Sequence, residues 1–449
     1  MKAFSRYVSD VRSAAVSLAT HHGSPRRMVS NVAFKTIADV ISKSVTLVIT
    51  VVAARVLSAS DFGVLALAMT TGWLISVASD AGLPLFLAKE AAQSTTERPL
   101  AYASVLRVIR VRAVLGALTM IAGLGVGFLV APRSSLAAFV LILLAQLATA
   151  VMDTLSHAYR GIDRSDIEAR LTLAIRSTTG ALAVWLLLVR PSLLGLAIAL
   201  ALMPSAGLLI SIGIASTLFA KGPGTASLDL SGRRFADEIG PIGAGILVSA
   251  LYFRCDIYFV EWWHGLDTVG VYNAAFRIVE ALRLFPAAVL AVAFPILCRA
   301  RDAGAVRQLG TWLLVGGGVL MAALLAGAPA ILDLLYGQRF VEGGAALRVL
   351  ALALPLFFVN YALTHQVIAW QGQHAYLAIT LVALIANLVG NLTLIPIHGM
   401  VGAAASTLVT ELVVSAGCLV ALARIGRRIT EPSPNSVVDQ TRHLLRLRA

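Results

Sequence analysis

Long runs of apolar residues, separated by short polar gaps, follow one another from residue 31 to residue 424. Each run is long enough for a helix of about 20 residues, which crosses the hydrocarbon core of a membrane. The pattern therefore predicts twelve membrane-spanning helices. They are expected at residues 31–57, 62–88, 108–131, 136–158, 167–189, 192–219, 239–262, 268–298, 306–335, 343–370, 374–396 and 401–424.

The polar segments divide the chain into two lobes. Residues 220–238 are rich in Gly and Ser and are typical of a linker. The sequence therefore predicts an N-lobe of six spans at 31–219 and a C-lobe of six spans at 239–424. A segment at 1–30 precedes them, and a basic tail at 425–449 follows.

The N-terminal segment, residues 1–30, does not have the pattern of a cleavable signal peptide, because no compact apolar core precedes a small-residue cleavage site. Its apolar residues repeat at helical spacing, with Lys2, Arg6 and Arg12 between them. This pattern suits an interfacial helix on an anionic membrane surface. A disordered tail is the alternative.

The two lobes resemble each other weakly in sequence. LSASDFGVLALA (57–68) resembles HGLDTVGVYNAA (264–275), and LLLVRPSLLGLAIA (186–199) resembles TLIPIHGMVGAAAS (393–406) at the same offset. YRG and WQG, which begin at Tyr159 and Trp370, recur at nearly that offset. Since six spans return the chain to the same side, the halves are parallel. Parallel repeats are a transporter architecture with the site between the repeats.

Composition agrees with a membrane protein. The chain is 58% hydrophobic and 13% charged, whereas soluble domains have about 45–50% apolar and about 25% charged residues. The fold class is therefore an all-α polytopic membrane protein. The net charge of +13 lies in short gaps beside spans, which favours lipid headgroups over nucleic acid as the partner. The three cysteines and eight histidines lack metal-site spacing, so we expect no cofactor, no metal and no disulfide.

The distribution of Lys and Arg predicts the orientation. With a cytoplasmic N-terminus, most basic residues fall in cytoplasmic segments, as the positive-inside rule requires. The opposite segments then carry only Arg55, Arg133, Arg190 and Arg339. Both termini are therefore expected in the cytoplasm, which agrees with an even number of spans.

Several spans carry polar side chains at steps of three and four residues, which place them on one helical face. Charge in hydrocarbon is costly, so such residues are expected to face protein or a water-filled lumen. Interhelical hydrogen bonding is the alternative. Arginine suits phosphate, so the basic residues are candidates for substrate binding. The substrate-binding candidates are Lys43, Arg254, Arg277 and Arg283; the candidates for coupling to H⁺ or Na⁺, or for counter-charge, are Asp39, Asp153, Asp256 and Glu280.

The segment LYFRCDIYFV (251–260) holds two charges inside an apolar run. Arg254 and Asp256 are two residues apart, so they point to nearly opposite sides of a helix and are not expected to pair. A tight turn at 263–267 folds the chain back. We therefore expect one of the two charges to approach a stripe that begins at Asn273, and the other to face a different helix.

Four segments together resemble the bacterial oligosaccharide flippases of the multidrug/oligosaccharidyl-lipid/polysaccharide exporter superfamily, which take part in polysaccharide biosynthesis. They are ARVLSASDFGVLALA (54–68) with AGLPLFLAKEAA (81–92), FRCDIYFVEWWHGLDTVGVYNAAFRIVEALRLFPAAVLAVAFPIL (253–297), ALRVLALALPLFFVNYALTHQVIAWQG (346–372) and NLTLIPIHGMVGAAASTLVTE (391–411).

The resemblance implies a V-shaped, alternating-access transporter in the bacterial inner (plasma) membrane. It would move an undecaprenyl-pyrophosphate-linked oligosaccharide, such as an O-antigen or exopolysaccharide repeat unit, through a cationic lumen. Lys43, Arg254 and Arg277 stand where lumen cations are expected. An H⁺ or Na⁺ gradient, or the membrane potential, would drive it, and a polysaccharide polymerase and chain-length proteins are expected partners.

Three other functions compete with this interpretation. A multidrug/cation antiporter of the same superfamily would favour a more acidic lumen with fewer arginines. A lipid II flippase tends to have two further helices, which the pattern lacks. An enzyme usually needs a catalytic loop or domain outside the bilayer, and the predicted outside loops are all short. We therefore expect no catalytic residues.

Overall fold

The computed structural model describes residues 25–93, 100–220, 233–287, 289–290 and 303–430. These residues form helices, with one isolated bridge between Ala101 and Ala220 and no strand among them. The chain divides into two compact units, Met1–Gly232 and Arg233–Ala449. Most of the N-terminal segment, the linker and the basic tail named above lie outside the described residues.

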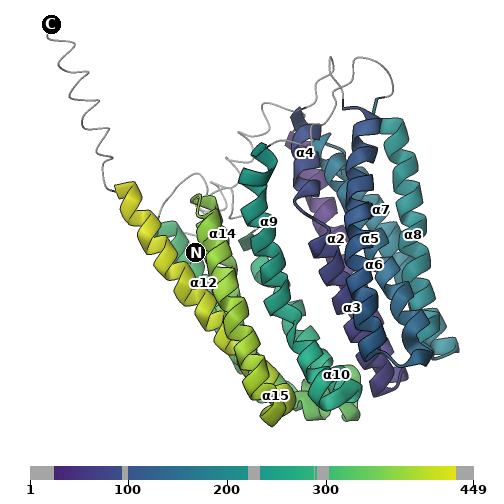
Figure 1. Ribbon diagram of the computed structural model, residues 1–449, viewed down its shortest axis with the longest axis vertical. Helices are drawn as coiled ribbons and strands as arrows, with labels where there is room; N and C mark the ends of the chain where they lie inside the picture. The colour runs from purple at the N-terminus through teal and green to yellow at the C-terminus, as the bar shows by residue number, and fades with distance from the viewer. Residues whose placement is uncertain (1–24, 94–99, 221–232, 288, 291–302, 431–449) are drawn as a thin grey trace, which may run out of the picture. The chain divides into compact units, whose positions relative to one another are not determined.

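Unit 1 is a bundle built around α6, which packs against α3, α4, α5 and α8, while α2 packs along α7 (Figure 1). Its helices are α2 (Pro25–Val56), α3 (Ala59–Ala78), α4 (Leu83–Gln93), α5 (Tyr102–Val130), η1 (Arg133–Ser135), α6 (Leu136–Gly161), α7 (Ser165–Val189) and α8 (Leu193–Leu218).

Unit 2 is a second helical bundle, in which α15 packs against α9, α10, α13 and α14. Its elements are α9 (Arg233–Arg254), α10 (Asp256–Leu282), α12 (Ala303–Tyr336), η2 (Gln338–Gly343), α13 (Gly344–Leu352), α14 (Leu354–Ala369) and α15 (Gln373–Thr430).

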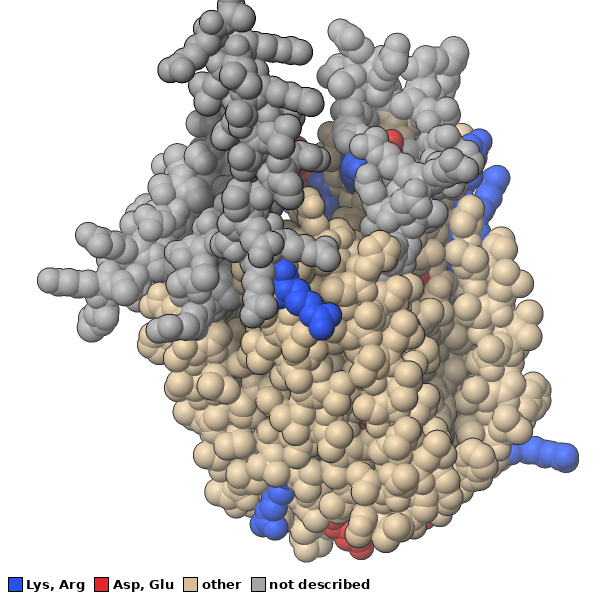
Figure 2. All heavy atoms as spheres, turned by 60° about the vertical axis from the view of Figure 1, so that its left-hand side comes forward, with Lys and Arg blue, Asp and Glu red and all other residues tan. Residues whose placement is uncertain are grey.

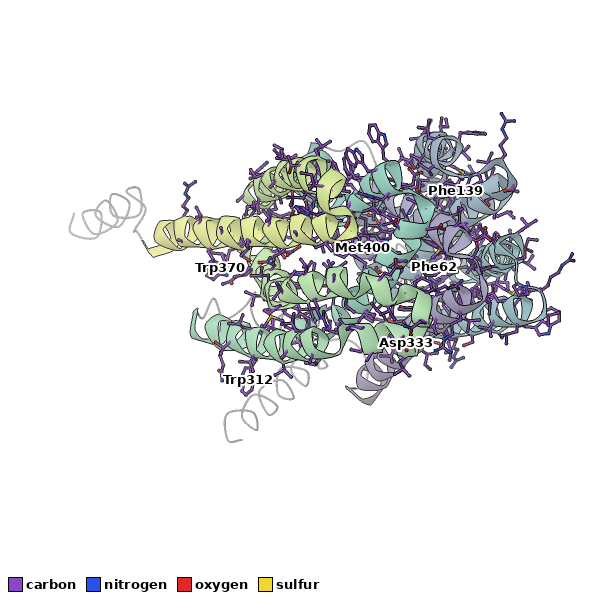
Figure 3. The ribbon with its side chains drawn as sticks, turned by 90° about the horizontal axis from the view of Figure 1, so that it is seen from below. Phe62, Phe139, Trp312, Asp333, Trp370 and Met400 are labelled. Atoms are coloured by element: carbon purple, nitrogen blue, oxygen red, sulfur yellow. The ribbon has the colours of Figure 1, made fainter. Side chains whose placement is uncertain are left out.

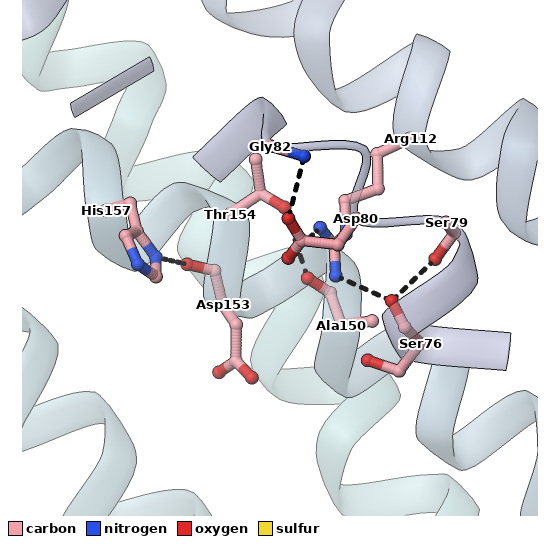
Figure 4. Close-up of polar contacts among 9 residues, drawn as sticks. All are labelled: Ser76, Ser79, Asp80, Gly82, Arg112, Ala150, Asp153, Thr154 and His157. Carbon is pink, nitrogen blue, oxygen red and sulfur yellow. Dashed lines mark hydrogen bonds and ion pairs between the residues drawn. The ribbon is translucent and has the colours of Figure 1, made fainter. Parts of the chain in front are cut away.

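The span expected at 62–88 is broken into α3 and α4. Ala81 and Gly82 have φ of 46° and 74°, a left-handed conformation that ends a helix. Oδ1 of Asp80 accepts the Gly82 N–H at 3.0 Å, which fixes the turn (Figure 4). A polar turn inside the span therefore separates the two helices.

Two helices of unit 2 are hairpins that reverse at a glycine with positive φ. In α15 this is Gly399, at φ 54°. Asn387 Nδ2 donates to Thr410 Oγ1 at 3.0 Å, and Ser406 Oγ donates to Asn387 O at 3.1 Å, which brings the two arms together. In α10 the reversal is at Gly265, at φ 78°.

The two hairpin turns of unit 2 contact each other. His264, beside the first turn, donates from Nε2 to the carbonyl of Ile395 at 2.8 Å, close to the second turn. Figure 1 accordingly shows α10 and α15 meeting at the same end of unit 2. The tight turn expected at 263–267 is thereby confirmed.

The helices account for the predicted spans. Within the described residues, eight helices are long and apolar enough to cross a membrane, and the bent pair Gln338–Leu352 and Leu354–Ala369 is a ninth. Two of the eight, Ile242–Ala287 and Gln373–Ile425, contain the hairpin turns, so each of them supplies two spans. With α2, each of the twelve predicted spans has a helical counterpart, although residues 288 and 291–298 of the span predicted at 268–298 lie outside the described residues.

The fold also repeats where the sequence does. YRG and WQG both end the fourth span of their unit. A residue with positive φ lies at each position: Asp163, at 58°, comes two residues after YRG, and Gln371, at 62°, is the middle residue of WQG. Gly161 lies so close to α4 that an added Cβ would stand 2.5 Å from the Ala88 carbonyl. The two tripeptides therefore close corresponding spans of the two units.

The outer surface is apolar, as a lipid environment requires. Figure 2 shows a face on which Lys, Arg, Asp and Glu are sparse. Large apolar side chains such as Leu129, Leu209 and Ile397 are exposed. Trp312 projects outward from α12 (Figure 3). Exposed apolar surface on this scale marks a multi-pass membrane protein.

Candidate functional site

The two charges in LYFRCDIYFV lie at a helix break. Arg254 ends α9 and Asp256 begins α10, with Cys255 between them. The N–H of Tyr258 donates to the Cys255 carbonyl at 3.1 Å, a three-residue step that departs from regular α-helix. Arg254 is 3% and Asp256 1% exposed, so both charges are buried in protein.

Both charges bind the returning arm of the α10 hairpin. Arg254 Nη2 donates to Asn273 Oδ1 at 2.9 Å, which confirms that one charge approaches the Asn273 stripe. The hydroxyl of Tyr272 donates to Asp256 Oδ2. The expectation that the second charge would face a different helix was wrong, because Asp256 binds Tyr272, which lies on the same arm as Asn273.

Asp256 is fully engaged as an acceptor. Its Oδ1 accepts the N–H of Ile257 at 2.8 Å, while its Oδ2 accepts the Tyr272 hydroxyl. It also stands at the N-terminus of α10, where the helix dipole favours negative charge. Its geometry is therefore that of a structural carboxylate that fixes the start of α10.

The other two candidate arginines of unit 2 differ in their partners. Arg277 Nη1 lies 2.8 Å from Glu280 Oε2, one turn along the helix, so these two charges offset each other. The guanidinium of Arg283 lies over the rings of Phe253 and Phe357, at 3.9 Å and 4.6 Å from their centroids. Within the described part of the chain, the Arg283 side chain has no hydrogen bond or ion pair.

The contacts of Arg283 leave its donors available. Aromatic rings hold a guanidinium by its face through cation–π attraction. The five N–H donors point outward in the guanidinium plane and suit carboxylate or phosphate. Arg283 is therefore a positioned cation with free donor capacity.

The candidates in unit 1 are less enclosed. Lys43 of α2 and Asp153 of α6 have exposed side chains. His157 donates from Nδ1 to the backbone carbonyl of Asp153 at 2.8 Å, one turn earlier (Figure 4). The side chain of Asp39 lies outside the described set.

Sequence reasoning missed two ion pairs that brace unit 1. Arg112 Nη1 lies 2.8 Å from Asp80 Oδ2. Arg160 donates to both oxygens of Glu168, at 2.6 Å and 2.8 Å, and joins α6 to α7 across their turn. The spacing of polar residues within a span does not reveal the pairing of Arg160 with Glu168, because the pair crosses the turn between two helices.

Sequence reasoning also missed a buried carboxyl in unit 2, Glu411 of α15, which is 4% exposed. Asn360 of α14 donates from Nδ2 to Glu411 Oε2 at 2.7 Å. Glu411 is a lone acidic residue in the apolar run 401–424. The rule that ionisable residues inside spans are functional candidates would have found it.

The Asn387 and Asn391 pair belongs to helix packing. Asn391 Nδ2 donates to Asn387 Oδ1 at 2.8 Å, and Cys255 Sγ donates to the same oxygen at 3.1 Å. Such bonds hold helices together inside a membrane. Across the residues that the structure describes, no group of three or more His, Cys, Asp or Glu side chains could hold a metal ion.

Comparison with known proteins gives one family. The model of the family "Polysaccharide biosynthesis protein" matches residues 28–301. "Probable flippase AglR" of Haloferax volcanii is 26% identical over 199 residues, which are 42% of this chain and 40% of that protein. The matched stretch therefore spans only about two fifths of that relative.

Solved structures share the fold. The lipid II flippase MurJ, in an inward closed conformation, matches with a TM-score of 0.61 and 14% identity over 87% of each chain. An inward-facing multidrug resistance MATE family transporter of the MOP superfamily matches with a TM-score of 0.58 and 15% identity, over 87% of this chain and 96% of that one. Because the family model covers more than half of the sequence, this chain belongs to the polysaccharide biosynthesis protein family, and its helices have the fold of MOP superfamily transporters.

Proposed function

We propose that this protein is a flippase for a lipid-linked oligosaccharide. Its substrate would be an undecaprenyl-pyrophosphate-linked repeat unit, moved across the bacterial inner (plasma) membrane by alternating access for surface polysaccharide or exopolysaccharide assembly. Family membership and the similarity to a probable flippase support this proposal. The termini would be cytoplasmic, and a polymerase and chain-length proteins would act on the product.

The observation that carries the proposal is the environment of Arg283. A pyrophosphate needs rigid, charge-assisted donors, and Arg283 is held by Phe253 and Phe357 with its N–H groups unused within the described residues. Its position is set before any ligand arrives, so little side-chain entropy is lost on binding. We therefore assign Arg283 the main contact with the pyrophosphate.

The remaining candidates would shape the potential around the substrate. Arg254 and Arg277 already have protein partners, Asn273 and Glu280, so they would contribute charge more than free donors. Lys43, which belongs to unit 1, stays a candidate substrate-binding cation. Among the acidic residues, Glu280 and Asp256 serve as counter-charges, while Asp39 and Asp153 stay candidates for coupling to H⁺ or Na⁺. No chemical step is needed for this transport, and no catalytic residue is proposed.

Transport can be tested with the purified protein in vesicles. The probe is a fluorescent disaccharide linked through pyrophosphate to a short polyprenol, placed in both leaflets, with an impermeant quencher added outside. We expect the protein to make the inner-leaflet pool accessible to the quencher, and Arg283→Ala to abolish this effect. Export of cationic dyes without movement of the lipid probe would instead identify a multidrug antiporter, and movement of lipid II alone would identify a lipid II flippase.

A further inference from the structure

Glu411 is the second buried carboxyl of unit 2, and its surroundings differ from those of Asp256. It lies in the second arm of α15, within a membrane span, and is 4% exposed. Asn360 Nδ2 donates to the backbone carbonyl oxygen of Glu411 at 2.9 Å and to its side-chain Oε2 at 2.7 Å. Ser415 donates to Asn360 Oδ1 at 2.6 Å, which fixes the amide with its nitrogen toward the carboxyl.

The second carboxyl oxygen has no donor. Asp256 accepts one hydrogen bond on each oxygen. In the described part of the molecule, Glu411 Oε1 accepts no hydrogen bond, and Glu411 forms no ion pair. A carboxylate is acceptor-only, whereas a carboxylic acid has one O–H and one oxygen that accepts. With Asn360 on Oε2, and with Oε1 absent from the enclosed, unpartnered polar atoms of the described residues, Glu411 can hold a proton on Oε1 and exchange it with water.

The apolar surroundings of Glu411 favour its protonated form. A bare carboxylate in an apolar interior is costly, and such groups bind a proton instead. Glu411 lies in a bundle whose neighbouring side chains are largely apolar: the core cluster beside it contains Val367, Val414 and Cys418. A positive charge placed close to Glu411 would therefore favour loss of its proton.

The ionisable groups around Glu411 are few. Arg283 lies over Phe357 of α14, and Asn360, three residues further along that helix, holds Glu411. The other ionisable groups near Glu411 are Tyr252 of α9 and Cys418 of α15. From α14 the facing group is the Asn360 amide. From α13 the charged residue is Arg348, which is exposed and donates to the Leu325 carbonyl instead. With Arg348 exposed and engaged elsewhere, Arg283 is the permanent cation that acts on Glu411 among these described groups.

The geometry suits a proton better than a metal ion. Ca²⁺ and Mg²⁺ take about six or more oxygen ligands. Here the nearest amide presents its nitrogen to the carboxyl, because its oxygen is bound to Ser415. The site thus offers the oxygens of one carboxyl and a donor, which is too small a set for a metal ion.

We propose that Glu411 is a proton-binding site that controls Arg283. With Glu411 protonated, the guanidinium of Arg283 is free to bind an anionic group such as pyrophosphate. When the Glu411 O–H bond breaks, the proton leaves to water and the carboxylate attracts Arg283, so that the anion is released. The proton site stands on geometry alone, and its use in transport rests on the function proposed above.

The first test needs no substrate. The full-length protein in detergent is titrated while its infrared spectrum is recorded, because the C=O stretch of a carboxylic acid is absent from a carboxylate. We expect this band in the wild type and in Glu342→Gln, a control at an exposed glutamate, and its loss in Glu411→Gln. Glutamate labelled with ¹³C in the wild type must shift the band, which covers the case in which the variant fails to fold.

Three results would overturn the proton site: absence of the band at every pH, no shift with labelled glutamate, or persistence of the band in a folded Glu411→Gln protein.

The second test places the same variants in vesicles with the fluorescent lipid probe and a pH gradient. We expect the gradient to accelerate the wild type and to have no effect on Glu411→Gln. Equal acceleration of the two proteins would contradict control of Arg283 by Glu411. Failure of the wild type to move the probe would reject the flippase proposal and the transport role, but not the infrared result.

Discussion

The guanidinium of Arg112 in α5 binds Asp80 at the break between α3 and α4, with Nη1 2.8 Å from Oδ2 (Figure 4). Its Nη2 also donates to the carbonyl of Ser76 at 3.2 Å, near the end of α3. A helix end leaves carbonyl groups without intrahelical partners, and in a membrane no water is available to satisfy them. One buried arginine on a neighbouring helix therefore stabilises the broken second span.

Replacing Arg112 should destabilise unit 1. Arg112→Ala leaves the Ser76 carbonyl and Asp80 without this partner. We expect a loss of about 2 kcal/mol, below the range for a fully buried pair, because the Asp80 side chain is 42% exposed. The thermal midpoint of the protein in detergent reports the change. Arg110→Ala, at an exposed position on the same helix, is the matched control, and an equal effect of the two substitutions would refute the role of Arg112.

The hydrogen bond from Tyr272 to Asp256 can be tested by removing one oxygen atom. Tyr272→Phe leaves a buried carboxylate with one donor fewer, which should cost about 1–3 kcal/mol. Tyr336→Phe is a sharp control, because the buried hydroxyl of Tyr336 has no hydrogen-bond partner among the described residues. We expect the control to be neutral or slightly stabilising in a denaturation experiment. A larger loss in Tyr336→Phe would show that Tyr272 is not the supporting residue.

Charge alone should not replace Arg283. Arg283→Lys keeps the positive charge but loses the planar group that lies over Phe253 and Phe357. We expect at least a tenfold loss of lipid-probe transport, about 1.4 kcal/mol, with normal protein level in the membrane. Arg424→Ala, at an exposed position in the same unit, should retain transport. Full activity of Arg283→Lys would exclude a specific contact with the guanidinium.

Orientation follows from the distribution of basic residues and is open to a labelling test. Arg190→Cys, after α7, is predicted on the outside, whereas Arg170→Cys, in the first turns of α7, is predicted on the cytoplasmic side; both positions are exposed. An impermeant maleimide should label the first variant in intact spheroplasts and the second only after permeabilisation. The reverse pattern would invert the topology.

The periodicity of apolar residues was enough to predict the spans, because the membrane imposes a length and a composition on each helix. It could not predict the break at Asp80, since the turn depends on local hydrogen bonds and on Arg112, which is 32 residues away along the chain. The proximity of Arg254 to Asn273 followed from folding a hairpin about a turn.

The individual roles of the charged residues were harder to predict. Composition marks Arg277 and Arg283 as equal candidates, but only the structure shows that the first is paired with Glu280 and the second is held by aromatic rings. Glu411 was overlooked because it stands alone in an apolar run, without a polar stripe to draw attention to it. Its partner Asn360 lies on another helix, at a separation that no periodicity reveals.

The most direct test of the proposed flippase is made in cells that lack this protein. Undecaprenyl-pyrophosphate-linked oligosaccharide is extracted from their membranes and measured together with surface polysaccharide. We predict that the lipid-linked unit accumulates unpolymerised, that the surface polymer disappears, and that the wild-type gene restores both whereas the gene for Arg283→Ala does not. Unchanged levels of both, with increased sensitivity to cationic drugs, would contradict the flippase proposal and identify an antiporter.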